Sequence, residues 1–262
     1  MGSHTFENRV KRLLKAGKKT AGAWLQIASP FTAEIMSRAG FDWLLIDMEH
    51  GPGDMMTLVS QLQAISGSGV VPIVRAPWND FVVVKRILDA GAYGILFPYV
   101  NTKADAQAAV RACKYPPEGI RGVAGSTRAA GYGQNPKDYL TKANDEILVI
   151  VAVETPEAIS QLGQILEVPG VDGVFIGPMD LSTSMGHPFD PSHPDVQAAV
   201  AAIEAQVLAA NKFLGTVSFS WEQAPSLYQK GYQMVTLMAD GVSLGKLATE
   251  IIGKFRAEFP EG

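Results

Sequence analysis

Residues 43–51 read Trp-Leu-Leu-Ile-Asp-Met-Glu-His-Gly, an apolar run that ends abruptly in charged and polar side chains. The run from Trp43 to Ile46 is apolar at every position, which predicts a strand that is buried on both of its faces. Strands of this kind belong to parallel sheets whose two faces are covered by other elements. The polar residues after Ile46 then lie at the carboxyl end of the strand. The stretch therefore indicates an α/β fold and the end of its sheet where a functional site would lie.

The same pattern recurs along the chain, because short apolar runs alternate with longer amphipathic stretches. The eight predicted strands are Ala21–Gln26, Trp43–Asp47, Val70–Val74, Gly94–Pro98, Ile147–Val153, Gly173–Ile176, Phe213–Val217 and Met234–Leu237. The predicted helices are Pro30–Ala39, Met55–Ser66, Phe81–Ala90, Lys103–Lys114, Thr155–Leu166, Pro194–Ala210, Glu222–Gln229 and Ser243–Phe259. Several helices are followed by a glycine, such as Gly40 and Gly91, which tolerates the left-handed conformation that ends a helix.

Strands that alternate with helices in this way predict a single (β/α)8 TIM barrel. A doubly wound open sheet is the main alternative, but the number and even spacing of the strands favour the barrel. The chain has 262 residues, which suits one barrel domain over residues 1–262. Within it, residues 1–4 have the composition of a cloning remnant and residues 240–262 form a C-terminal helix. Residues 115–137, rich in Gly and Pro, are expected to be a long functional or mobile loop.

The composition excludes several classes of protein. With 47% apolar and 18% charged residues, the chain is typical of a globular protein rather than a disordered one. A formal net charge of −4 does not favour nucleic-acid binding. No run approaches about 18 apolar residues, so we expect no contact with a membrane. The single cysteine, Cys113, excludes an internal disulfide and a Cys-rich zinc site, and it suits a cytoplasmic protein.

Charged side chains follow five of the predicted strands. In a TIM barrel the active site lies at the carboxyl ends of the strands, so these side chains converge on one mouth. One His, one Arg and up to five carboxylates are candidates: His50, Arg75, Asp47, Glu49, Glu154, Asp180 and Asp240. Each has a structural explanation when taken alone, because Asp180 can cap a helix and Glu154 suits the first turn of one. Their joint placement indicates a site.

The types of these residues favour a hard divalent cation. Mg²⁺ and Mn²⁺ prefer oxygen ligands, and they keep positions open for water or for substrate oxygens. Glu154 and Asp180 would leave room for an α-keto acid to chelate the ion, which would stabilise negative charge on the keto oxygen. Arg75 can stabilise the same charge, and His50 can move a proton near neutral pH.

Other chemistries fit the sequence less well. No lysine stands just past a predicted strand, which argues against a Schiff base. Gly125-Ser126-Thr127 is not a strand-to-helix elbow, so a hydrolase with a catalytic triad is not indicated. Residues 173–177 lack the lysine of a phosphate-binding loop. A barrel that binds a keto acid without catalysis remains an alternative.

Longer motifs resemble one known family. They are residues 41–51, Val74-Arg75, residues 115–122, Val153-Glu154-Thr155 and residues 170–182. In this order they are similar to motifs of the HpcH/HpaI aldolase family, and the resemblance extends from about Asn8 to Phe255. It implies a class II, metal-dependent aldolase that reversibly cleaves a 4-hydroxy-2-oxo acid through a metal-stabilised enolate. The products would be an aldehyde and pyruvate, or a close 2-oxo acid such as hydroxypyruvate. An acyl-CoA lyase of the related citrate and malyl-CoA lyase type is the alternative enzyme.

The resemblance also implies roles for single residues. Glu154 and Asp180 would bind Mg²⁺, Mn²⁺ or Co²⁺, with no organic cofactor, and Asp47 and Glu49 would hold metal-bound water. His50 would be the acid–base catalyst and Arg75 would contact the keto oxygen. Asp89 would pair with the histidine of a neighbouring subunit in a hexamer, a trimer of dimers that exchange the helix over residues 243–259. The substrate-binding residues would be Trp24, Ala152, Gly177, Pro178, Met179, Val217 and Arg128.

The sequence departs from the family pattern at several positions near these motifs. Ala152 stands where relatives commonly have Gln, and Met179 stands where they commonly have Ala. The loop over residues 121–133 retains Arg128, but Gly131-Tyr132 replaces a frequent Arg-Trp pair. Loss of an arginine would weaken selection for a distant carboxylate on the aldehyde. We therefore expect intact machinery with altered specificity.

Overall fold

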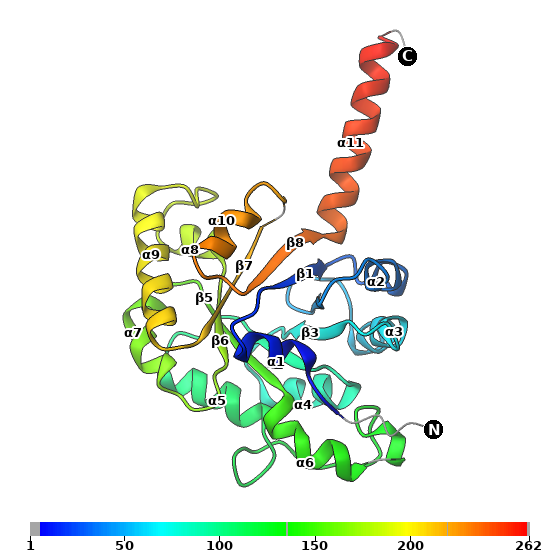
Figure 1. Ribbon diagram of the computed structural model, residues 1–262, viewed down its shortest axis with the longest axis vertical. Coiled ribbons are helices and arrows are strands. Elements are labelled where there is room, and N and C mark those ends of the chain that lie inside the picture. The colour runs from blue at the N-terminus through cyan, green and yellow to red at the C-terminus, as the bar shows by residue number, and fades with distance from the viewer. Residues whose placement is uncertain (1–5, 135, 219, 261–262) are drawn as a thin grey trace.

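Eight parallel strands close into a barrel in the computed structural model, which describes residues 6–134, 136–218 and 220–260 (Figure 1). The strands are β1 (Thr20–Leu25), β2 (Trp43–Asp47), β3 (Val71–Arg75), β4 (Gly94–Phe97), β5 (Leu148–Val153), β6 (Gly173–Ile176), β7 (Phe213–Val217) and β8 (Met234–Ala239). Each strand pairs in parallel with the next, and β8 pairs with β1. This closure confirms the predicted TIM barrel and excludes the open sheet, whose edge strands would be unpaired. Residues 1–4 lie outside the described residues.

In Figure 1 the helices surround the barrel, except for α11, which projects away from it. They are α1 (Arg9–Lys15), α2 (Pro30–Ser37), α3 (Met55–Ile65), α4 (Phe81–Ala90), α5 (Lys103–Cys113), η1 (Gly131–Gly133), α6 (Pro136–Glu146), α7 (Pro156–Leu166), α8 (Pro178–Ser184), α9 (Pro194–Ala209), α10 (Ala224–Gln229) and α11 (Asp240–Glu258). Every predicted helix is present, with ends shifted by a few residues. The helix α6 was not predicted. The apolar signal of α6 is weak, because Tyr139 and Ala143 are its buried residues. Among the described residues, no helix is both long enough and apolar enough to span a membrane.

Two hydrophobic clusters explain why the strands are apolar on both faces. In β2, Trp43 and Leu45 belong to a cluster that fills the barrel, whereas Leu44 and Ile46 pack in the cluster between the sheet and the helices. Successive side chains of a strand point to opposite faces, so each strand contributes to both clusters. Val10 and Leu14 of α1 join the inner cluster and close one end of the barrel.

Small residues let large rings fill the barrel. A Cβ atom added at Gly22 of β1 would lie 2.2 Å from the indole of Trp43, which is fully buried. A Cβ atom added at Gly173 of β6 would likewise lie 2.5 Å from the ring of Phe213. Barrel interiors are packed cores, so no space remains for another methyl group at these positions.

We therefore expect Gly22→Ala to destabilise the protein by about 1–3 kcal/mol, because the added methyl group must displace the Trp43 ring. Gly163→Ala in α7 is the matched control, since no atom lies within 4 Å of its Cβ position. The control should raise stability by up to about 1 kcal/mol, because alanine favours helix more than glycine does. Urea unfolding of the three proteins measures both effects. Equal stability of Gly22→Ala and the wild type would contradict this account of the barrel interior.

Candidate active site

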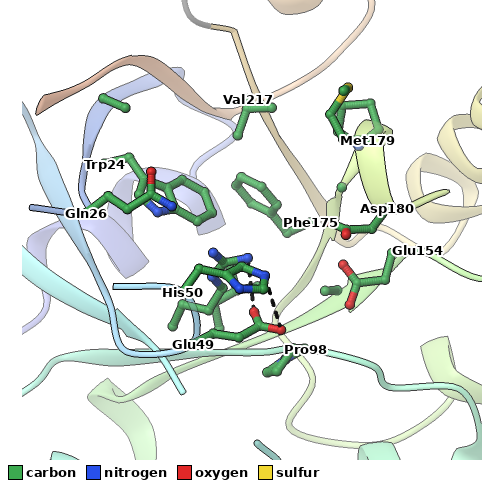
Figure 2. Close-up of a pocket in the computed structure, with 16 residues that line it drawn as sticks. Trp24, Gln26, Glu49, His50, Pro98, Glu154, Phe175, Met179, Asp180 and Val217 are labelled. Carbon is green, nitrogen blue, oxygen red and sulfur yellow. Dashed lines mark ion pairs between the residues drawn. The ribbon is translucent and has the colours of Figure 1, made fainter. Parts of the chain in front are cut away.

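A cavity of about 270 Å³ lies at the carboxyl ends of the barrel strands. Figure 2 shows its lining side chains, among which Glu154 and Asp180 stand near one another and Glu49 lies beneath His50. Eleven of the sequence-predicted site residues line it: Trp24, Glu49, His50, Arg75, Ala152, Glu154, Gly177, Pro178, Met179, Asp180 and Val217. Three others, Asp47, Asp89 and Arg128, do not.

The pleat of the strands explains this selection. Counting in steps of two from an inner core residue keeps to the same face of a strand. From Ile73 in the inner cluster the next inward position is Arg75, and from Ile150 the next ones are Ala152 and Glu154. The site side chains thus continue the inward register past the end of each strand, where the packed interior gives way to the cavity.

Asp47 and Arg75 form a buried ion pair at the floor of the cavity. Arg75 donates from Nε to Oδ1 of Asp47 at 3.0 Å and from Nη2 to Oδ2 at 2.6 Å. Asp47 also accepts hydrogen bonds from the indole of Trp24 and from the backbone N–H groups of Glu49 and His50. Burial opposes ionisation of Asp47, but the hydrogen bonds and charge of Arg75, with the hydrogen bonds from Trp24 and His50, together hold its pKa below the ordinary value. Asp47 therefore orients Arg75 from below the cavity.

Glu49 and His50 lie beside this pair. The Glu49 Oε2 atom is 3.0 Å from Nη1 of Arg75, yet this buried oxygen accepts no hydrogen bond in the described residues. Burial raises the pKa of Glu49, and the charges of Asp47 and Asp180 add to the effect against that of Arg75. The Nε2 atom of His50 is 3.8 Å from Oε1 of Glu49, and 59% of the His50 side chain is exposed. His50 is thus open to a molecule at the mouth.

Glu154 and Asp180 face the space above Gly177. A Cβ atom at Gly177 would lie 3.0 Å from Oε2 of Glu154 and 3.5 Å from Oδ2 of Asp180, so glycine leaves this space open. Glu154 is 5% exposed and accepts a hydrogen bond from the backbone N–H of Tyr99 at 2.8 Å. Burial raises the pKa of Glu154 to about 7, and the charges of Asp180 and Glu49 contribute. Two oxygen donors that repel one another, with open space between them, fit a hard divalent cation.

A second group of possible metal ligands lies outside this cavity. The ligand atoms of His187, His193 and Asp195 are all within 4.8 Å of one another. The two imidazole rings stack 3.5 Å apart, however, and Nδ1 of His193 already accepts the backbone N–H of Asp195. Stacked rings direct their lone pairs side by side rather than at a shared ion, so we assign no ion to this group.

Three sequence candidates are held elsewhere. Asp89 at the end of α4 accepts a 2.7 Å hydrogen bond from Arg121, and its predicted partner in a neighbouring subunit stays a prediction. Arg128 donates to the backbone carbonyls of Ala90 and Leu62, at the ends of α4 and α3. Asp240 lies directly after the carboxyl end of β8, but it does not line the cavity. It accepts the N–H groups of Gln26, Ile27 and Gly241 and the Thr32 hydroxyl, and thereby ties α11 to the segment after β1.

The cavity also contains residues that the sequence reasoning missed, namely Gln26, Leu96, Pro98, Phe175 and Ala239. Gln26 was placed inside the first predicted strand, but β1 ends at Leu25, so Gln26 is the first residue beyond it. A count of two from Trp24 would have identified it. The apolar members carry no chemical signal, and only the inward register marks them.

Comparisons with known proteins agree with this architecture. The chain matches the family described as HpcH/HpaI aldolase/citrate lyase over residues 20–246. It is 44% identical to the 4-hydroxy-2-oxo-heptane-1,7-dioate aldolase of Shigella sonnei and 43% identical to the protein of that name from Escherichia coli, with 97% of each chain covered. An HpcH/HpaI aldolase/citrate lyase family protein from Burkholderia cenocepacia superimposes with a TM-score of 0.91. The two are 39% identical, over 95% of this chain and 99% of that chain.

The raised pKa of Glu154 predicts a pH-dependent stability in EDTA-containing buffer. The folded protein, with a pKa of about 7, holds this proton more tightly than the unfolded chain does. The stability from protonated Glu154 is therefore present at low pH and is lost as the pH rises toward and above 7. Relative to Glu154→Gln, which stays neutral, the wild type should lose about 3 kcal/mol between pH 5 and pH 8. Urea unfolding at each pH measures the difference.

The exposed variant Glu157→Gln keeps Glu154 and serves as the control, so its stability should follow that of the wild type at every pH. A Glu154→Gln protein whose stability follows that of the wild type at every pH would show that burial and repulsion do not act on this carboxylate.

Proposed function

The chain belongs to the HpcH/HpaI aldolase/citrate lyase family of carbon–carbon lyases, and we propose that it is a class II aldolase that requires a divalent cation. It would cleave 4-hydroxy-2-oxo acids to an aldehyde and pyruvate, or a close 2-oxo acid. One observation carries the proposal: Glu154 and Asp180 face an open space in the same cavity as Arg75 and His50. The reaction requires chelation of the cation, stabilisation of negative charge and transfer of a proton. Residues that can perform all three thereby lie in one cavity.

Glu154 and Asp180 would hold the cation. Their oxygen donors, and a described cavity lining that holds no thiolate and only the thioether of Met179, favour Mg²⁺, Mn²⁺ or Co²⁺ over softer ions. When bound, the cation supplies a Lewis acid that stabilises negative charge on the keto oxygen of the substrate. Glu49, which lines the same cavity, would accept a hydrogen bond from a water molecule through its carboxylate.

The other side chains would orient the substrate and move its proton. Arg75 is held on two sides by Asp47 and Glu49, so its remaining N–H groups are aimed without further loss of side-chain freedom. His50, which is exposed at the mouth, would take a proton from the methyl carbon of the 2-oxo acid and return it during cleavage. The N–H groups of Met179 and Asp180 lie in the first turn of α8, where such donors suit the substrate carboxylate.

Deuterium exchange into the methyl group of pyruvate tests this function without an aldehyde. We expect exchange with added Mg²⁺ or Mn²⁺, loss of exchange after treatment with EDTA, and recovery when the ion is restored. Arg75→Lys should slow exchange about 100- to 1,000-fold, because one point charge replaces the aimed N–H groups. Lysine is preferred to alanine because the buried Asp47 would otherwise lose its partner, at a cost of about 3–5 kcal/mol.

The exposed substitution Arg38→Lys is the matched control and should leave exchange unchanged. Full exchange after exhaustive removal of divalent ions, measured by NMR, would contradict a metal-dependent aldolase.

We further propose that α11 packs against a second copy of the chain. Figure 1 shows α11 projecting away from the barrel, and Asp240 is its one buried residue. Leu244, Leu247, Ile251 and Phe255 are exposed at helical spacing, so they form an apolar stripe. A stripe of this kind is typical of a surface that another element covers. A homo-oligomer in which α11 is exchanged between subunits would cover it.

Light scattering coupled to size-exclusion chromatography tests the stripe. The wild type should have a mass of at least twice the 28.0 kDa of one chain. The double variant Leu247→Asp/Ile251→Asp should shift toward the monomer, because two charges cannot enter an apolar interface. Glu250→Ala, a change in a charged pair on the same helix, should keep the wild-type mass. A monomeric wild type at micromolar concentration would refute the assembly.

A further inference from the structure

We infer that the aldehyde partner of this cavity is uncharged and apolar at its far end. The inference rests on the proposed aldolase function and names its substrate class. The relatives are named for a heptane-1,7-dioate, which has a carboxylate at each end. In that compound the 4-hydroxyl loses its proton, the C3–C4 bond breaks, and its electron pair goes to the fragment that becomes pyruvate. The other fragment is an aldehyde that carries the second carboxylate, succinic semialdehyde.

The charges of the cavity give a second carboxylate no partner. Among the described residues that line it, Arg75 is the one permanent cation, against the carboxylates Glu49, Glu154 and Asp180. A divalent cation together with Arg75 would just balance these three groups, so the carboxylate of the 2-oxo acid already leaves the site negative. Arg75 is occupied by Asp47 and Glu49 as well. A further anion would therefore be repelled by the site.

One wall of the cavity, where an aldehyde chain would lie, presents carbon and sulfur at Met179, Val217 and Phe175. In Figure 2, Met179 and Val217 lie on one side of the cavity, with the rings of Trp24 and Phe175 next to them, whereas Glu49 lies on the opposite side. Met179 is 37% exposed although it lines the cavity, so its thioether is available to a ligand. An alkyl group gains free energy when it leaves water for this wall, whereas a carboxylate loses free energy because it must give up its hydration. The wall therefore favours an alkyl group.

Arg128, which the family resemblance implied as a substrate-binding residue, is not at this wall. Both terminal nitrogens of Arg128 donate to backbone carbonyls, Nη1 to Ala90 at 2.8 Å and Nη2 to Leu62 at 3.1 Å. Its charge serves the ends of two helices. Selection for a second carboxylate would need a cation at Met179 or Val217, and neither residue supplies one.

The test compares pentanal with succinic semialdehyde, which has a similar chain length and a terminal carboxylate, as acceptors for pyruvate. The value of kcat/KM for pentanal should be higher by about tenfold or more. Added salt should raise the value for succinic semialdehyde and leave that for pentanal almost unchanged, because repulsion is screened whereas apolar contact is not. Saturation-transfer NMR without divalent ions adds a readout independent of turnover, in which pentan-1-ol and not 4-hydroxybutanoate should receive saturation.

Two substitutions locate the selection at the apolar wall. Met179→Lys changes the charge with little change in length, so the wild type is its own matched control. It should improve kcat/KM for succinic semialdehyde relative to pentanal by about tenfold. Because a lysine next to Asp180 can pair with that carboxylate, Val217→Lys is the second test, with Val217→Met as the uncharged control of similar shape. The lysine variant should shift the ratio and the methionine variant should not.

The outcomes separate the two proposals. A wild type that prefers succinic semialdehyde at low and high salt overturns the uncharged acceptor and leaves the aldolase function standing. Absence of product with every aldehyde, together with absence of methyl-proton exchange, overturns the aldolase function and this inference with it. Preference for pentanal that both lysine variants leave unchanged overturns the assignment of the selection to Met179 and Val217.

Discussion

The buried ion pair between Asp47 and Arg75 is the interaction on which the cavity depends. The two residues are register partners at the ends of the neighbouring strands β2 and β3. Because the Asp47 side chain is fully buried, its charge is stable only while Arg75 donates to both of its oxygens. The same carboxylate accepts the indole N–H of Trp24 and the backbone N–H groups of Glu49 and His50. One buried charge thus orients an arginine, a ring and a turn.

Around this pair the cavity concentrates more negative charge than its single arginine can balance. Burial and the neighbouring carboxylates raise the pKa of Glu154 to about 7, and Glu49 also resists ionisation. Buried carboxylates that repel one another destabilise the folded chain when no ligand is bound. Such clusters are common at sites that bind a ligand of opposite charge. The excess charge and the apolar wall at Met179 and Val217 act together. The excess negative charge suits a cation, and the apolar wall gives a second anion no partner.

The barrel and its last helix differ in how far each is buried within a single chain. The barrel satisfies its own backbone, because β8 pairs with β1, and its interior is filled by rings that pack over glycines. By contrast, α11 is joined to the barrel chiefly through Asp240, whose carboxylate binds the segment after β1. Its apolar stripe remains exposed. The stability of the barrel and the burial of α11 are therefore separate matters, and in the proposed assembly other copies of the chain would bury α11.

The sequence by itself determined the eight strands, the barrel class and most of the charged groups at the mouth. Continuous apolar runs mark buried parallel strands, and a polar residue after such a run stands out at once, as Arg75 and Glu154 do. The tertiary structure decided which positions face inward. Strands that are apolar on both faces show no alternation, so the register that brings Leu96 and Phe175 into the cavity cannot be read until the barrel closes. It also decided the partners of Arg128, whose charge is held by carbonyls far away in the sequence. No local pattern encodes a contact between distant segments, because that contact exists only once the helices have packed.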